Sequence, residues 1–246
     1  MDVALSRRLL DINREFYSVF ADSFSATRSR PWTGFSHLLP YIQDGCHVLD
    51  VGCGNGRLAG FLDTVRKTVC YLGVDSSPRL VELAQERADT LGCVSASYRM
   101  ADVTSSDWTD AMRVEGFDVV VALGLLQHIP GVDLRQRIIR QAGSLLSPGG
   151  VVLVSNWQFR ASQRLRERIV PWSRVGIDPT GLESGDYLLD WRRDGVGYRY
   201  CHQLTEDEVA ILASAANLQV SESIYADGPQ DNLNLYSVLG PVQTPP

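Results

Sequence analysis

The chain has 246 residues and a mass of 27.2 kDa, a length that suits one large domain better than two small ones. Its apolar fraction of 44% and charged fraction of 21% exclude a mainly disordered chain, and no apolar run approaches the ~18 residues of a membrane span. The net charge of −6 has the wrong sign for a protein that binds nucleic acid through its whole surface.

The basic residues are almost all arginines, and several of them are clustered in the sequence. Arginine supplies 22 of the 23, and Lys67 is the single lysine. Five arginines fall between Arg160 and Arg174, where Glu167 is the only acid. A local basic strip on an acidic body is one interpretation, and a general bias toward arginine is the other.

The five cysteines form an odd set without a Cys-x-x-Cys pair, so the sequence predicts neither a disulfide framework nor a structural metal site. The first eight residues lack the apolar core and the small-residue cleavage site of a signal peptide. Together these features predict a cytoplasmic protein that crosses no membrane.

The first 44 residues are expected to form a helical cap. Apolar residues at spacings of three to four predict an amphipathic helix from Leu5 to about Phe20. After a polar stretch, Pro31 suits the first turn of a second helix that runs to about Ile42.

Strands and helices then alternate with short connections. Strands are expected at 48–51, 69–74, 94–100, 117–123 and 151–154, and helices at 58–65, 78–91 and 133–146. Ser76 or Ser77 caps the second of these helices, and Pro148-Gly149-Gly150 turns the chain into the fifth strand. Right-handed crossover units stacked into a parallel sheet, with helices on both faces, account for this order.

The alternation stops at residues 158–203, an insertion rich in arginine, glycine, aspartate and aromatic residues, in which a helix is expected from Phe159 to Ile169. A long irregular insertion in a compact domain is usually functional, and this one is placed on the acceptor side. A capping box at Thr205–Glu208 then opens a helix to about Asn217.

Two last strands, at 219–225 and 233–239, are expected to form an antiparallel hairpin at the sheet edge, and the tail 242–246 is expected to fray. The sequence therefore predicts a single α/β domain over residues 1–246. Its seven-stranded sheet is mostly parallel with an antiparallel last strand.

A glycine loop, Asp50-Val51-Gly52-Cys53-Gly54-Asn55-Gly56, follows the first strand. It lies at the carboxyl edge of the sheet, where doubly wound folds bind ligands, and its glycines let backbone amides approach a ligand closely. The third glycine comes one residue earlier than in the dinucleotide fingerprint. Asp50 would repel a pyrophosphate, whereas S-adenosylmethionine (SAM) carries an ammonium and a sulfonium and no phosphate. The loop therefore favours SAM over NAD.

Two further acids end the next two strands. Asp75 can accept hydrogen bonds from both ribose hydroxyls, and Asp102 can accept one from an adenine amino group. A lone acid after a strand is usually a turn or cap residue, but three at consecutive strand ends beside this loop together indicate SAM. The predicted cofactor-binding residues are Asp50, Gly52, Cys53, Gly54, Gly56, Asp75, Ser76, Asp102, Val103 and Leu123.

Residues 46–155 and 204–240 resemble the class I SAM-dependent methyltransferases, which implies their Rossmann-like fold. Segments outside this core resemble the tRNA wobble-uridine methyltransferases, which esterify 5-carboxymethyluridine and include the methyltransferase domain fused to an AlkB-type dioxygenase. These segments are Phe20 to Trp32, Val170-Pro171-Trp172, Arg199-Tyr200-Cys201-His202 and Asp231-Asn232. The sequence departs from that family at Gln127-His128, where a histidine pair is usual, at Leu233, which replaces an aromatic residue, and at Cys201, which replaces a tyrosine.

The resemblance implies methyl transfer to the carboxylate of a wobble uridine. A carboxymethyl group has a pKa of about 4, so its oxygen is ionised at neutral pH and the reaction needs no general base. The site has to hold the carboxylate in line with the methyl group. The candidate catalytic residues for this task are Arg199, His202 and His128, although either histidine could instead brace the fold.

Arginine and tryptophan residues are the candidates for contact with RNA. Arginines grip phosphates, and tryptophans stack on an extruded base. The candidate substrate-binding residues are Arg28, Arg30, Trp32 and Trp172, with a place in the core as the alternative for both tryptophans.

The family resemblance also implies two partners, the tRNA anticodon loop and a small zinc-binding activator protein. Strand 94–100, expected at the sheet edge, offers the activator a place by β-augmentation. Two other functions stay open: methylation of a small carboxylate or hydroxyl metabolite, which the net charge of −6 favours, and SAM binding without turnover. Salt-dependent tRNA binding would discriminate between methylation of tRNA and methylation of a small metabolite.

Overall fold

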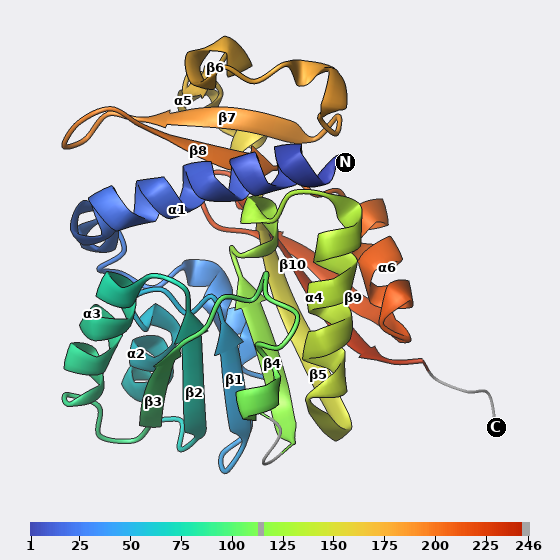
Figure 1. The fold of residues 1–246 in the computed structure, drawn as a ribbon. Coiled ribbons are helices and arrows are strands. Elements are labelled where there is room, and N and C mark those ends of the chain that lie inside the picture. Colours follow the sequence, from blue (N-terminus) through green and yellow to red (C-terminus); the bar gives the residue numbers. More distant parts are fainter. Residues whose placement is uncertain (113–115, 243–246) are drawn as a thin grey trace.

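The computed structural model describes residues 1–112 and 116–242, so the tail 243–246 lies outside it. Its main sheet has seven strands in the order β3-β2-β1-β4-β5-β10-β9. The strands are β1 (His47–Val51), β2 (Cys70–Asp75), β3 (Ser95–Met100), β4 (Phe117–Leu123), β5 (Leu146–Trp157), β9 (Leu218–Ala226) and β10 (Asn234–Pro241). Strand β10 pairs antiparallel with both neighbours, and the other six strands share one direction. The predicted sheet is therefore confirmed (Figure 1).

Helices cover both faces of this sheet because its strands alternate their side chains. Val48 packs on one face with α2 (Arg57–Thr64) and α3 (Pro78–Ala88). Leu49 packs on the other face with α4 (Val132–Ser144) and α6 (Glu206–Ala215). Ser77 caps α3, and Thr205 and Glu208 form the predicted capping box of α6. These two helices thus begin where their sequence signals place them.

Strand β5 is longer than predicted. It begins at Leu146, so Pro148-Gly149-Gly150 lies inside the paired strand and is not a turn before it. The register between β4 and β5 shifts at this point, and Gly149 has φ +82°. The three residues therefore form an irregular stretch in a continuous strand.

The N-terminal segment forms one long helix and one short one. Helix α1 (Val3–Ala26) runs past the predicted end at Phe20, where its backbone leaves helical geometry, so the helix kinks and continues. The second predicted helix shortens to a 3₁₀ helix, η1 (Thr33–Leu38). The Asp227 carboxylate accepts from the Gly34 amide at 2.8 Å and holds η1 to the sheet edge.

The insertion contains a sheet that the sequence did not predict. Strands β6 (Ile169–Val170), β7 (Asp186–Trp191) and β8 (Gly197–His202) pair antiparallel, and short 3₁₀ helices flank them: η4 (Phe159–Ala161), η5 (Trp172–Val175) and η6 (Pro179–Gly181). The helix predicted from Phe159 to Ile169 is wrong, because the backbone is extended at Ser162 and only α5 (Gln163–Arg166) is helical. Phe159 and Leu165 are nevertheless buried, in a small cluster with Cys201.

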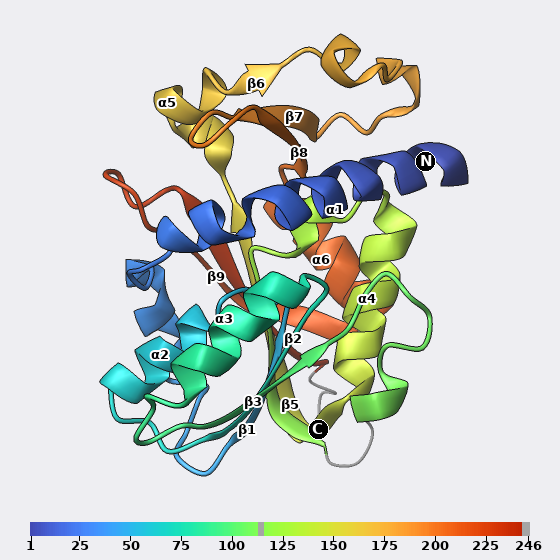
Figure 2. The same cartoon turned by 60° about the vertical axis from the view of Figure 1, so that its left-hand side comes forward.

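Helix α1 lies between the carboxyl edge of the main sheet and the insertion, as two views of the molecule show (Figures 1 and 2). Leu9 and Ile12 of α1 pack on Leu188 and Tyr200 of the second sheet. No helix within residues 1–112 or 116–242 is long and apolar enough to span a membrane.

Candidate active site

A cavity of about 930 Å³ lies at the carboxyl ends of the parallel strands. The loops after β1 to β4 line it on the sheet side, and α1 and the insertion line it on the opposite side, which we call the roof side. Nine of the ten predicted cofactor-binding residues line it: Asp50, Gly52, Cys53, Gly54, Asp75, Ser76, Asp102, Val103 and Leu123. Gly56 lies behind the loop as the N-cap of α2, where an added Cβ would lie 2.6 Å from the Tyr98 hydroxyl.

The glycine loop needs glycine for both conformation and space. Gly52 and Gly54 have φ angles of +77° and +55°, which side chains with a Cβ rarely adopt. An added Cβ at Gly54 would meet no atom within 4 Å, so the backbone at this point borders open space. The loop therefore presents its backbone to a ligand in the cavity.

Asp50 is the most deeply buried acid of the sheet side, with 3% of its surface exposed. The Tyr71 hydroxyl donates to Oδ2, and Oδ1 is buried without a hydrogen-bond partner. Burial raises the pKa of Asp50 to about 7, although the Tyr71 hydrogen bond opposes the change. A cationic ligand beside Oδ1 would favour the ionised form.

The other two acids are held by defined donors. Asp75 accepts from the amides of Gly54 and Ser77, both at 2.9 Å, and burial raises its pKa despite these bonds. Asp102 accepts from Arg14 of α1 at 2.9 Å; burial opposes ionisation, but bonds from Thr104 and Arg14 outweigh it and lower the Asp102 pKa. Three carboxyl groups thus lie along the sheet side of the cavity.

The roof side carries positive charge. Arg199 of β8 is 5% exposed, and its guanidinium lies 4.9 Å from the ring centre of Phe16, 5.6 Å from that of Trp157 and 5.5 Å from that of Trp191. Its Nε has no hydrogen-bond partner, and no carboxylate within the described residues pairs with it. Arg28 lies over the Phe24 ring at 3.5 Å. Burial, followed by repulsion from Arg199, lowers the Arg28 pKa to about 9.

His128 lines the cavity between the two sides, in η3 (Leu126–His128) after β4. Its Nδ1 lies 3.1 Å from the Tyr200 carbonyl, which can only accept, so Nδ1 carries the proton and Nε2 accepts from the Tyr17 hydroxyl at 3.3 Å. Burial, with repulsion from Arg199, lowers the His128 pKa to about 3. His128 is therefore neutral and a very weak base.

Three predicted acceptor residues lie outside the cavity. His202 is 1% exposed and bonds to Asp186 and Glu208, so the prediction that it contacts the acceptor is corrected. Trp172 packs toward Tyr200 in the cluster between α1 and the second sheet, and Arg30 is exposed. Trp32 does line the cavity, where Arg57 lies over its ring at 4.0 Å.

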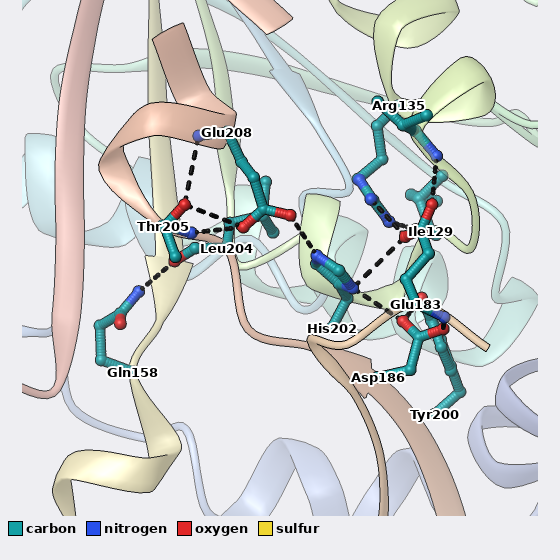
Figure 3. Close-up of polar contacts among 11 residues, drawn as sticks. Ile129, Arg135, Gln158, Glu183, Asp186, Tyr200, His202, Leu204, Thr205 and Glu208 are labelled. Atoms are coloured by element: carbon teal, nitrogen blue, oxygen red, sulfur yellow. Dashed lines mark hydrogen bonds and ion pairs between the residues drawn. The ribbon is translucent and has the colours of Figure 1, made fainter. Parts of the chain in front are cut away.

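Glu183, Asp186 and His202 offer ligand atoms within 4.8 Å of one another, a spacing that could suit a metal ion. However, Arg135 donates to Glu183 at 2.6 Å, and each ring nitrogen of His202 already faces a carboxylate. Figure 3 shows these side chains converging from the insertion, α4 and α6. The cluster is an ion-pair network, which a bound divalent cation would have to break.

Several cavity residues escaped the sequence analysis: Asn13, Tyr17, Arg57, Trp157 and Trp191. Asn13 left a usable signal, because it is a polar residue beside Ile12 on the buried stripe of α1. Its side chain exchanges hydrogen bonds with the Tyr200 backbone, 187 positions away. Trp191 left no local signal, since it reaches the cavity on β7 of the insertion sheet, which the sequence did not predict.

A family model described as a methyltransferase domain matches residues 42–190, more than half of the chain. The chain belongs to this methyltransferase family. A tRNA (carboxymethyluridine(34)-5-O)-methyltransferase of Xenopus tropicalis is 30% identical over 174 residues, covering 70% of this methyltransferase and 25% of the relative. A ubiquinone biosynthesis O-methyltransferase of Azorhizobium caulinodans is 32% identical over 178 residues, covering 72% of this chain and 60% of the relative. The chain spans about a third or less of the length of its tRNA-methyltransferase relatives.

Solved structures agree on the fold. Magnesium protoporphyrin IX methyltransferase from Synechocystis PCC 6803, with bound SAH, superposes with a TM-score of 0.65 at 15% identity, covering 94% of this chain and 99% of that one. The predicted cofactor is confirmed as SAM. The residues present fit it, because the unpartnered Oδ1 of Asp50 and the carboxylates of Asp75 and Asp102 suit an ammonium and hydroxyl groups.

Proposed function

We propose that this methyltransferase forms the methyl ester of a 5-carboxymethyl wobble uridine in tRNA. The observation that carries the proposal is Arg199, a buried guanidinium that lines the cavity and has, within residues 1–112 and 116–242, a free Nε and no carboxylate partner. Burying an unpaired cation is costly, so the site is complete only when an anion joins it. Arg28, also without a carboxylate partner among the described residues, adds to the same field.

The weak basicity of His128 supports a carboxylate over a hydroxyl acceptor. Removing a hydroxyl proton requires a base whose pKa lies near the working pH, and that of His128 is about 3. A carboxylate is already ionised and needs no base. The roof side therefore suits an acceptor that arrives as an anion.

The chemistry asks little of the protein beyond orientation. Bound SAM supplies a methyl group on a positively charged sulfur; the carboxylate oxygen gains the new C–O bond as the S–C bond breaks, and no proton moves. Arg199 Nε and the buried, unpartnered Nε1 of Trp191 are the donors that would hold the carboxylate. Their aromatic surroundings exclude water, which strengthens both hydrogen bonds.

A polynucleotide acceptor is supported by the arginines that line the cavity from the insertion, Arg164, Arg168, Arg192 and Arg193. Arg168 and Arg192 pair with Asp190, whereas Arg164 and Arg193 pair with no carboxylate among the described residues. We call these four arginines the arginine rim. Exposed unpaired arginines bind phosphates, so the arginine rim, more than the net charge of the chain, determines the proposed affinity for RNA. Because α5 ends at Arg166, Arg164 lies in this helix and Arg168 lies beyond it.

A small carboxylate metabolite is the second candidate acceptor. Helix α1 covers the cavity, and a volume of about 930 Å³ suits a small molecule as well as one nucleotide. The relative from Azorhizobium caulinodans is named for ubiquinone biosynthesis, which keeps this alternative in view.

The zinc-binding activator and the cytoplasmic location stay predictions. Strand β3 is a sheet edge, as expected, and Met100 at its end is exposed. None of the relatives compared above supports an activator, so it forms no part of the proposed function.

The deciding experiment incubates the full chain with SAM and with tRNA that carries 5-carboxymethyluridine, followed by mass spectrometry of the nucleosides. The methyl ester is expected, with tRNA affinity that falls steeply as salt rises. Absence of the ester together with transfer to a small carboxylate would replace the first candidate acceptor with the second. Unmodified tRNA is the matched control, because it binds the arginine rim but offers no carboxylate.

A further inference from the structure

Strand β8 presents different residues to its two faces. Arg199 lines the cavity, and Cys201, on the same face of the strand, is buried with its Sγ 3.8 Å from His128 Nδ1. Tyr200 and His202 face the other way and both bond to Asp186, at 2.7 Å each. One face of the strand therefore bears the proposed anion site, and the other bears His202.

His202 is held by carboxylates at both ring nitrogens. Nδ1 lies 2.7 Å from Asp186 Oδ1, and Nε2 lies 2.9 Å from Glu208 Oε1. An ionised carboxylate can only accept, so both nitrogens carry protons and the ring is a cation. Burial lowers the His202 pKa, but the bonds to Asp186 and Glu208 outweigh it and the net change is a rise. The bond to His202 lowers the Glu208 pKa to about 2.

The groups around the ring come from every element packed against it. Asp186 lies on β7, Glu183 on the loop before it, Glu208 on α6 and Arg135 on α4, and Tyr200 is its neighbour on β8. Glu183 also accepts from the Val132 amide at the start of α4 at 2.9 Å. The network therefore fastens the insertion sheet to two helices of the main domain (Figure 3).

We infer that protonated His202 is a positioning residue that fixes β8, and with it Arg199, above the cavity. Asp186 and His202 are directly opposite each other in the β7–β8 register, and Arg199 is three residues earlier on the same short strand. Loss of the ring proton leaves a lone pair facing a carboxylate, which removes one bond and adds repulsion at the end of the strand. What Arg199 binds rests on the proposed function; the positioning itself does not.

The first test follows the histidine ring protons by NMR over pH 5 to 9. The chain has four histidines, and His202→Gln identifies the signal by its loss. The His202 midpoint is expected above its ordinary value of about 6.5. Glu208→Gln removes one of the two facing charges and is expected to lower this midpoint by at least ~0.5 pH unit. A wild-type midpoint at or below ~6.5 would overturn the inference.

The second test uses tryptophan emission as a report on Arg199, because Trp157 and Trp191 lie within 5.6 Å of its guanidinium. Emission is expected to change with pH at the His202 midpoint, with no acceptor or cofactor present. The dependence should vanish in His202→Gln and persist in His37→Gln, which replaces an exposed histidine. If His202→Gln fails to fold, Glu208→Gln decides the question instead. In this variant the pH midpoint of tryptophan emission must shift together with the NMR midpoint of His202. Midpoints that shift independently contradict the coupling between His202 protonation and the position of Arg199.

Activity measurements then separate this inference from the proposed function. In His202→Gln, KM for the tRNA acceptor is expected to rise about tenfold while the Kd for SAM stays within about twofold. If no tRNA acceptor is found but emission and NMR midpoints still coincide, the proposed function fails and the positioning role stands. If methyl transfer to tRNA occurs but the emission and NMR midpoints diverge, the proposed function stands and the positioning role fails.

Discussion

The sheet side and the roof side of the cavity are built by different kinds of contact. On the sheet side, Asp75 bonds to Ser77 two residues on and to Gly54 in the neighbouring loop. On the roof side, Tyr200 bonds to Asn13 across 187 residues and to His128 across 72. Cofactor chemistry is thus encoded in short sequence motifs, whereas acceptor chemistry is assembled from distant segments.

The sharpest way to break this comparison is Arg199→Ala. Removing the unpaired roof-side cation is expected to lower transfer by at least ~100-fold while the Kd for SAM stays unchanged, because the sheet side is intact. Calorimetry with SAM and methyl-transfer assays measure the two effects. Arg7→Ala, an exposed arginine on α1, is the control. Loss of SAM binding in Arg199→Ala would show that the two sides are not independent.

The converse change is Asp75→Ala, which is expected to weaken SAM binding about tenfold or more, since a carboxylate that accepts from ribose hydroxyls is lost. Asp75 also anchors the Gly54 amide, so a melting curve has to accompany the calorimetry. Asp89→Ala, at the exposed end of α3, is the matched control. Unchanged affinity in a folded Asp75→Ala protein contradicts the ribose assignment.

The pH dependence of SAM binding tests Asp50. Its folded pKa of about 7 means that the carboxyl group ionises between pH 6 and 8, and a cationic ligand binds the ionised form better. Affinity should therefore rise about tenfold from pH 6 to pH 8. Asp50→Asn should abolish this rise, and a wild-type affinity that is flat over this range would refute the assigned role.

The smallest expected effect concerns the rim. Replacing Arg164 and Arg193 together by alanine should reduce the slope of log affinity for tRNA against log salt by about 1 to 2. Filter binding at several salt concentrations measures it, and SAM affinity is the internal control. An unchanged slope would place the RNA backbone elsewhere.

The main sheet could be predicted because its order follows from the alternation of strands and helices, and the handedness rule leaves few alternatives. The acids at the ends of β1 to β3 could be predicted because parallel strands bring their carboxyl ends to one edge. Ser77 and Thr205 were recognisable because capping is a local interaction.

The insertion could not be predicted in the same way. Phe159 and Leu165 lie in a segment predicted as one helix, yet they are buried by strands β7 and β8, which come later in the chain, so tertiary packing outweighs local preference. His202 illustrates the same limit: its sequence position beside Arg199 suggested a shared role, but alternation along β8 turns the two side chains to opposite faces. No local pattern reveals which face a short strand turns to a cavity.

Helix α1 touches both sides of the cavity, and its ion pairs to Asp102 and Arg79 lie at the surface. Exposed ion pairs weaken as electrolyte is added. Because residues of α1 line the cavity, we expect higher ionic strength to hasten release of the spent cofactor and, on the proposed function, to loosen RNA from the arginine rim. Turnover would then have an optimum salt concentration, at which RNA is still retained on the arginine rim and helix α1 is loose enough to release the cofactor product.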